Sequence, residues 1–357
     1  MLNPVVTRRG FLFYFAANMK KKIIYGTLIV LLLAGGYGAW QVFGPTVSAP
    51  EGNYLYIKTG STYETVRAQL LDKKIIRNAF FFDLVAKQAK YSKSIRPGRY
   101  AISKGMSVYN LLRMLRAGRQ SPVNLVIIKL RLPEDLASKL AANFEIDSVS
   151  VMAFLTNTDS LQHYQLNNQT LMTAVIPNTY AILWNSSISK IFRRLYTEKE
   201  KFWNDERIKK ASALNMTPEQ VYSMASIVDE ETNKDEDRGL IASVYINRIN
   251  SGQRLEADPT IKFALRNFGL KRIRDVHKNA AAASPYNTYF VKGLPPGPIC
   301  TPSSKTIDAV LNAPVTDYLF FVARPDWSGL SNFAASYTEH MVNAKNYQRF
   351  LDSVNIR

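Results

Sequence analysis

A long apolar segment near the N-terminus dominates the hydropathy pattern of this chain. Residues 23–43 carry no charged side chain, and a helix needs about 20 predominantly apolar residues to cross a bilayer. Trp40 stands where an aromatic side chain would meet the membrane interface. The pattern predicts a membrane-spanning helix over 23–43. A cleaved signal peptide is the alternative, but the apolar run continues into Trp40 and Phe43 instead of ending in a small-residue cleavage site.

The flanking charges predict how this helix is oriented. Five basic residues precede it without any acidic residue, and cytoplasmic flanks carry an excess of Lys and Arg. We therefore expect a cytoplasmic tail over 1–22, a single span, and a chain that lies outside the cytoplasm after Gly44. This topology argues against intracellular nucleic acid as a partner. The five residues are Arg8, Arg9, Lys20, Lys21 and Lys22.

A compact module is expected after the Pro- and Ser-containing linker 44–53. Alternating positions predict a strand over 54–58, and residues 97–102 are typical of a turn followed by a strand. Two helices are predicted between the two strands. The first helix would begin at a capping box of Ser61 and Glu64, and the second would extend over 79–89. Asn78 is the expected N-cap of this second helix. A further helix follows, with Ser107 as its N-cap and Gly118 as its C-terminal stop.

The remaining pattern predicts an α+β fold of several core helices with few strands. Buried strands are expected over Val123–Leu130 and Tyr318–Val322, with a third possible at Asn332–Phe333. Residues 144–172 are polar and give little structural signal. Helices are expected over 133–143, 189–203, 217–232 and 237–250, and from His340 to the C-terminus.

The helix over 217–232 contains an acidic run with two different environments. Thr217 and Gln220 form a capping box around Pro218, which suits the first helical position. Glu231 continues the apolar stripe of this helix, so we expect a buried carboxyl group with a raised pKa that can act as a general acid. Its neighbours Asp229 and Glu230 are expected to be solvated. The stripe consists of Met224, Ile227, Val228 and Glu231.

A lone glutamate on a helix is more often structural than catalytic. In that alternative, Glu231 would be paired with Arg238 or Arg248 in the last helical turn.

Composition excludes several kinds of chemistry. The 357 residues carry a net charge of +18, but the basic residues do not form one long run typical of nucleic-acid binding. Cys300 is the only cysteine and there are three histidines, so neither a disulfide nor a common zinc motif is available. We expect no metal and no cofactor, and we interpret Cys300, which Pro298 and Pro302 flank in a loop, as a structural thiol.

Three loops with Pro, Gly and polar residues follow the helical region. They are expected over 255–260, 284–289 and 293–299, where Asp, Asn, Thr and Tyr side chains on stiff turns could bind a sugar chain. Each loop taken alone is more typical of an ordinary turn. The predicted substrate-binding residues are Asp258, Thr260, Tyr286, Asn287, Thr288 and Tyr289.

Five motifs in this order resemble the YceG-like family of endolytic murein transglycosylases, also called MltG. They are Ala-Ser-Ile-Val-Asp-Glu-Glu-Thr at 225–232, Ala-Ser-Val-Tyr-Ile-Asn-Arg at 242–248, Asp-Pro-Thr at 258–260, Tyr-Asn-Thr-Tyr at 286–289 and Gly-Leu-Pro-Pro-Gly-Pro-Ile at 293–299.

The resemblance implies a membrane-anchored enzyme that cuts the β-1,4 bond between N-acetylmuramic acid and N-acetylglucosamine within nascent peptidoglycan strands. The family catalyst is the second acidic residue of Ile-Val-Glu-x-Glu, which is Glu231 here, and Asp229 replaces the first. The family's Phe-Pro-Asp-Thr-Tyr element reads Ile-Pro-Asn-Thr-Tyr at 176–180, which leaves a substrate role of that loop in doubt. Expected domains are a LysM-like βααβ subdomain over 54–121, a connecting region over 122–175 and a catalytic domain over 176–357.

A single carboxyl group can catalyse this reaction, because the muramyl 6-hydroxyl attacks its own C1 and yields a 1,6-anhydro end. Two alternatives remain. A lysozyme-type hydrolase would need a second carboxylate, for which Asp258 and Glu256 are the candidates. A non-catalytic glycan-binding scaffold would instead recruit peptidoglycan synthases in the membrane.

Overall fold

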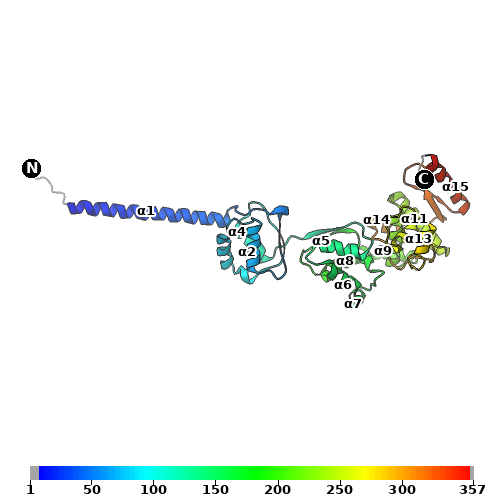
Figure 1. The fold of residues 1–357 in the computed structure, drawn as a ribbon, viewed down its shortest axis with the longest axis horizontal. Helices are drawn as coiled ribbons and strands as arrows, with labels where there is room; N and C mark the ends of the chain where they lie inside the picture. Colours follow the sequence, from blue (N-terminus) through cyan, green and yellow to red (C-terminus); the bar gives the residue numbers. More distant parts are fainter. Residues whose placement is uncertain (1–7, 354–357) are drawn as a thin grey trace, which may run out of the picture. The chain divides into compact units, whose positions relative to one another are not determined.

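The computed structural model describes residues 8–353, with side chains from Met19 onward (Figure 1). Helix α1 (Arg8–Phe43) contains the predicted span, and its segment Met19–Phe43 is long and apolar enough to cross a membrane. The apolar window of this segment has no side chain buried within the protein. Residues 1–7 of the predicted basic tail lie outside the described residues.

The chain forms two compact units. The first contains residues up to Pro122 together with Leu183–Asn185, and the second contains Val123–Ile182 and the chain from Ser186 onward. From Val123 onward, the region that we expected to be a connector therefore belongs to the same unit as most of the predicted catalytic domain. The predicted domain boundaries themselves stay a prediction.

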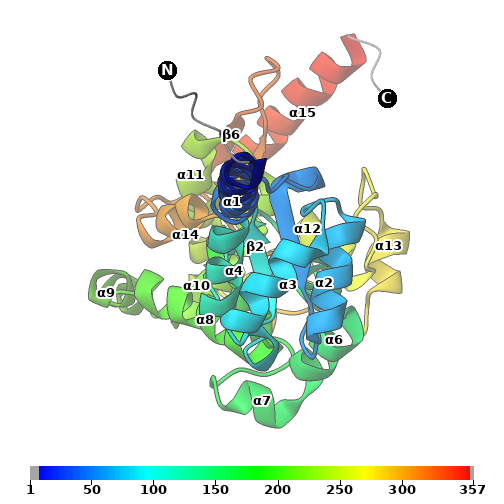
Figure 2. The same cartoon turned by 90° about the vertical axis from the view of Figure 1, so that its left-hand side faces the viewer.

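In the first unit, two helices lie between two antiparallel strands, as the sequence pattern predicts. Tyr54 pairs with Ala101 at one end of this sheet and Ile57 pairs with Gly98 at the other. Figure 2 views α1 nearly end on, with α2 and α3 side by side. The elements are β1 (Tyr54–Ile57), α2 (Tyr63–Asp72), α3 (Ala79–Gln88), β2 (Gly98–Ala101) and α4 (Val108–Ala117).

One capping assignment in this unit is wrong. Thr62, and not Ser61, is the N-cap of α2, because its extended backbone lets the hydroxyl accept a hydrogen bond from the Thr65 amide. The N-caps predicted at Asn78 and Ser107 and the left-handed C-cap at Gly118 are confirmed.

The second unit contains two small antiparallel sheets. β3 (Val123–Ile127) pairs with β4 (Asn178–Ile182), and β5 (Phe320–Ala323) pairs with β6 (Ser331–Ala334). The expectation of two buried strands is wrong, because β3 buries only alternate residues and β5 is half-exposed along its length. The segment 176–180, expected to be a loop, lies mostly in β4.

Helices make up most of the second unit. The region 144–172, for which the pattern gave little signal, contains α6, α7 and the start of the 3₁₀ turn η3 (Leu171–Ala174). The helices are α5 (Pro133–Asn143), α6 (Ser148–Thr156), α7 (Thr158–Gln162), α8 (Ile188–Phe202), α9 (Asp205–Ala213), α10 (Pro218–Glu231), α11 (Asp235–Asn250), α12 (Asp258–Ala264), α13 (Asp275–Ala280), α14 (Ser304–Leu311) and α15 (Tyr337–Ser353).

Helix α10 lies at the centre of the second unit. It packs against α11, α12 and α14, and its residues from Val221 to Asp229 are all buried. Burial on every side is typical of a central helix, whereas a surface helix buries one stripe. This packing holds the C-terminal end of α10, and hence the acidic run, rigidly in place.

Candidate active site

The predicted start of α10 is confirmed. The Thr217 hydroxyl accepts a hydrogen bond from the Gln220 amide at 3.2 Å, and the Gln220 side chain accepts one from the Thr217 amide at 2.8 Å. This capping box sets the register of the helix, which ends at Glu231 with Thr232 as its C-cap. The register places the three acidic residues on different sides of the last turn.

The expectation that Asp229 and Glu230 are solvated is wrong. Asp229 is 7% exposed and pairs with Lys129 at 2.8 Å. The Glu230 side chain is 15% exposed and pairs with Arg131 at 2.9 Å and Lys129 at 3.2 Å. The segment that follows β3 supplies both cations. These two carboxylates are thus occupied by ion pairs.

The environment of Asp229 keeps it ionised. Burial alone would raise the pKa of this carboxyl group, but hydrogen bonds from Lys129 and from the Thr306 hydroxyl outweigh burial and hold the pKa below its usual range. A carboxylate held in this way is a structural anion and a poor proton donor near neutral pH.

Glu231 occupies a different environment. Burial raises its pKa from 4.5 to about 7, although a hydrogen bond from the Tyr245 hydroxyl at 2.8 Å opposes the rise and the nearby charge of Asp258 adds to it. The side chain keeps partial solvent exposure through a cavity of about 320 Å³. Glu231 can therefore exchange a proton near neutral pH with a molecule bound in that cavity.

The structural alternative for Glu231 does not hold. Arg238 pairs with Asp235, and Arg248 pairs with Glu256 at 3.3 Å. Within the described residues, Glu231 has no ion pair with either arginine, and Tyr245 is its hydrogen-bond donor.

Elements far apart in the sequence form the walls of the cavity. Arg248 is buried and donates hydrogen bonds to the backbone carbonyls of Leu319, Arg254 and Leu255. It thereby joins the start of β5 to the loop before α12. The lining residues are Glu231, Tyr245, Arg248, Leu255, Glu256, Asp258, Tyr289, Phe320, Phe321 and His340.

Sequence reasoning missed several of these lining residues. Nothing in the sequence pattern of α11 indicates that the Tyr245 hydroxyl contacts a carboxyl group. Phe320 and His340, whose rings stack at 5.1 Å, come from β5 and α15. No local signal could have placed the C-terminal region in this cavity.

Two of the six predicted substrate-binding residues line the cavity. Tyr289 donates a hydrogen bond to Asp258 at 2.6 Å, so the two side chains form one polar group beside Glu231. Asp258 begins helix α12 with Pro259 at its first turn, which corrects the expectation of a loop over 255–260.

Three others lie behind the cavity wall. The hydroxyls of Thr260 and Thr288 are 2.8 Å apart, and Thr288 also accepts from the Ala257 amide. The Asn287 amide group donates to the carbonyls of Lys278 and Ala281. All three side chains are fully buried and satisfied, so they position the backbone that carries Asp258 and Tyr289.

Tyr286 faces a separate cavity of about 400 Å³. Its ring lies 4.7 Å from that of Phe263, and the cavity extends to α5 and α6.

The Pro- and Gly-rich segment 293–299 is attached directly to α10. The Ile299 amide donates to the Ser226 hydroxyl at 3.0 Å. Gly297 is required by close packing, because a Cβ atom there would lie 2.0 Å from the Gln169 carbonyl oxygen. This segment therefore packs against α10 and supports it.

Cys300 adds no chemistry to the site. It is buried, and burial raises the pKa of its thiol well above the usual value. Within residues 8–353, no group of three or more His, Cys, Asp or Glu side chains is arranged to hold a metal ion.

Comparison with known proteins agrees with this architecture. The model of the YceG-like family matches residues 55–346. The chain belongs to the YceG-like family. Proteins named endolytic murein transglycosylase are similar to it, at 26% identity in two strains of Streptococcus pneumoniae (84% of this chain) and at 25% in Bacillus subtilis (80% of this chain and 81% of that protein).

The chain spans 60% of the length of the S. pneumoniae relatives. A YceG-like protein of known crystal structure from Listeria monocytogenes has a similar fold. It aligns with a TM-score of 0.54 and 25% identity over 81% of this chain and 98% of that protein.

Proposed function

We propose that this protein is a peptidoglycan lytic transglycosylase in which Glu231 is the catalyst. The observation that carries the proposal is a carboxyl group with a pKa of about 7 at the edge of a cavity. The endolytic murein transglycosylases of S. pneumoniae and B. subtilis, which share 25–26% identity with this chain, support the substrate class.

In the proposed reaction, Glu231 acts first as an acid and then as a base. The protonated carboxyl group donates its proton to the glycosidic oxygen, and the bond from that oxygen to C1 of the muramyl residue breaks. The resulting carboxylate then removes the proton of the muramyl 6-hydroxyl while the C6 oxygen bonds to C1. Glu231 ends protonated, no water is consumed, and the new end is a 1,6-anhydro sugar.

The other cavity residues are assigned supporting roles. The Tyr245 hydroxyl orients the Glu231 carboxyl group. Asp258, held by Tyr289, places negative charge near the glycan and stabilises the positive charge that develops at C1. The side chains of Tyr286, Thr260, Asn287 and Thr288 do not line the cavity. We therefore assign these four residues to supporting the segments that carry Asp258 and Tyr289.

A lysozyme-type hydrolase is the second candidate, because Asp258 and Glu256 also line the cavity. Either carboxylate could activate a water molecule on the opposite face of the sugar. Two contacts favour the transglycosylase. Asp258 accepts a hydrogen bond from the Tyr289 hydroxyl, and Glu256 pairs with Arg248, so both carboxylates already have partners.

We also propose where the enzyme acts. Helix α1 would anchor it as a single-pass protein of the bacterial cell membrane, with the tail cytoplasmic and both units outside. The βααβ unit over 54–121 would be LysM-like, and a membrane-embedded peptidoglycan synthase would be a partner that supplies nascent strands.

Mass analysis of digested glycan strands tests the reaction. The wild-type protein is expected to release 1,6-anhydromuramyl ends, which are lighter by one water than the reducing ends of a hydrolase. Glu231→Gln is expected to lower the rate by about 10³-fold or more, which is the scale of general acid–base catalysis. Glu230→Gln is the matched control and should lose less than about tenfold. Full anhydro-product formation by folded Glu231→Gln would overturn the assignment.

A further inference from the structure

The net charge of the protein is concentrated in the first unit. Residues 44–122 contain 14 Lys and Arg against 4 Asp and Glu, a net charge of +10. Residues 123–357 contain 27 basic against 24 acidic residues, a net charge of +3 over a segment three times as long. A field of this sign attracts anions to the short unit that follows the membrane helix.

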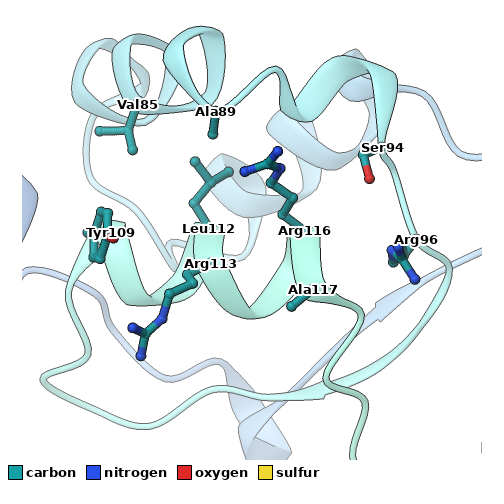
Figure 3. Close-up of a pocket in the computed structure, with 9 residues that line it drawn as sticks. All are labelled: Val85, Ala89, Ser94, Arg96, Tyr109, Leu112, Arg113, Arg116 and Ala117. Carbon is teal, nitrogen blue, oxygen red and sulfur yellow. The ribbon is translucent and has the colours of Figure 1, made fainter.

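An arginine-lined cavity lies between α3 and α4 within this unit. It has a volume of about 400 Å³, with an apolar floor that includes Val85 and Leu112. Figure 3 shows the Arg116 side chain extending from α4 toward Ala89, the residue that follows α3. Arg96 and Arg113 complete the basic lining.

These arginines are available for a ligand. Among the described residues, no carboxylate forms an ion pair with Arg96, Arg113 or Arg116, and all three side chains are exposed. Arg96 packs over Gly118, where an added Cβ would lie 2.6 Å from the Arg96 Cδ atom. The left-handed C-cap of α4 thus leaves room for Arg96 beside the cavity.

The same two helices contact the end of the membrane helix. Tyr109 of α4 packs on Phe43 with ring centroids 5.4 Å apart, and Phe81 of α3 packs on Tyr37 at 6.0 Å. Next to Phe81, α3 exposes Phe80 (63%) and Leu84 (55%). Exposed apolar side chains beside the C-terminal end of α1 suit the boundary between lipid acyl chains and headgroups.

We propose that this cavity binds the phosphate group of an anionic membrane lipid. Arginine is suited to phosphate because its planar guanidinium donates paired hydrogen bonds. The apolar floor would contact the glycerol and upper acyl region, while Phe80 and Leu84 enter the boundary layer. The inference rests on the proposed membrane anchoring through α1 and is independent of the proposed catalytic activity.

Native mass spectrometry of the full chain in detergent tests this proposal. Phosphatidylglycerol and phosphatidylcholine are titrated onto the wild type, onto Arg113→Gln/Arg116→Gln and onto the charge-matched control Lys58→Gln/Lys104→Gln. We expect the arginine variant to lose about 10- to 30-fold in phosphatidylglycerol affinity, with no change for phosphatidylcholine. The control, altered at exposed lysines outside the cavity, should lose less than about threefold, because salt screens charges that do not contact the ligand. Arg96→Gln provides a second variant if the double variant does not fold.

Three results would overturn the proposal. One is an equal loss in the lysine control, which would indicate unspecific charge attraction. Another is unchanged phosphatidylglycerol binding in both arginine variants. The third is binding of inorganic phosphate as tight as that of phosphatidylglycerol, which would indicate a free phosphate ligand. Anhydro-product formation on isolated strands should be equal in all variants, so a failure of the catalytic proposal would appear separately.

Discussion

The arginine-lined cavity of the first unit and the Glu231 cavity of the second carry opposite chemistry. That of the first unit is about 400 Å³ and lined by three arginines, whereas that of the second is about 320 Å³ and lined by three carboxylates. The difference lies in how the charges are paired. The three carboxyl groups that line the second cavity are held by Tyr245, Tyr289 and Arg248, whereas Arg96, Arg113 and Arg116, which line the first, have no carboxylate partner among the described residues.

The contrast distinguishes a site that holds catalytic groups in position from a site that attracts an anionic ligand. Catalysis requires groups that are held in place before the substrate binds, and the carboxyl groups of the Glu231 cavity are held by hydrogen bonds and an ion pair. Attraction of an anion requires charge that remains available. Removing one charged side chain from each cavity should therefore have different consequences.

The largest expected difference is between Arg248 and Arg113. Arg248→Met leaves three backbone carbonyls without their donor, and we expect the free energy of unfolding of the second unit to fall by about 3–4 kcal/mol. Arg113→Met should change stability by less than about 0.5 kcal/mol, because its side chain is exposed. Urea denaturation followed by circular dichroism measures both. A similar loss in the two variants would contradict the contrast.

The second prediction concerns the pH dependence of stability. The folded-state pKa of Glu231, about 7, lies above its ordinary value of 4.5. The folded protein therefore binds more protons between these values, and wild-type stability falls as the pH rises through this window. Glu231→Gln cannot ionise, so at pH 8 it should be more stable than the wild type by up to about 3 kcal/mol.

Thermal unfolding at several pH values measures this effect. Near pH 4 the two proteins should have nearly equal stability, because the wild-type carboxyl group is then protonated. Glu230→Gln is the control and should lack this alkaline gain, since it breaks the ion pair with Arg131. An advantage of Glu231→Gln that is equally large at pH 4 would show that the carboxyl group is not the cause.

A smaller effect is expected from Asp258→Asn. The charge of Asp258 raises the pKa of Glu231, so its removal should lower that pKa by up to about one unit. The reaction needs protonated Glu231, and the alkaline fall of kcat/KM should therefore move to lower pH. A pH–rate profile on glycan strands measures the shift. Movement to higher pH would contradict the assigned electrostatics.

The smallest expected effect is that of Gly118→Ala in the first unit. Its φ of +66° strains a residue with a Cβ atom, at a cost of about 1 kcal/mol. Gly60→Ala is the matched control, with a φ of +81° and no atom near the added Cβ. Both should lose similar stability, but only Gly118→Ala displaces Arg96 and should weaken phosphatidylglycerol binding. Equal lipid affinity in the two variants would remove Arg96 from the proposed site.

The sequence alone determined the features that depend on neighbouring residues. Capping chemistry and helical periodicity predicted where α10 begins and which of its glutamates continues the apolar stripe, because both are set within one or two turns. The two helices between two strands in the first unit follow from equally local signals.

Only the tertiary structure decided which charges are free and which are paired. The solvation expected for Asp229 and Glu230 was wrong because Lys129 and Arg131 approach from a distant segment. The predicted polar side chains of Thr260, Asn287 and Thr288 turn inward, while Phe320 and His340 reach the cavity from the C-terminal region. Such pairings depend on contacts between distant segments, and periodicity along one element carries no information about them.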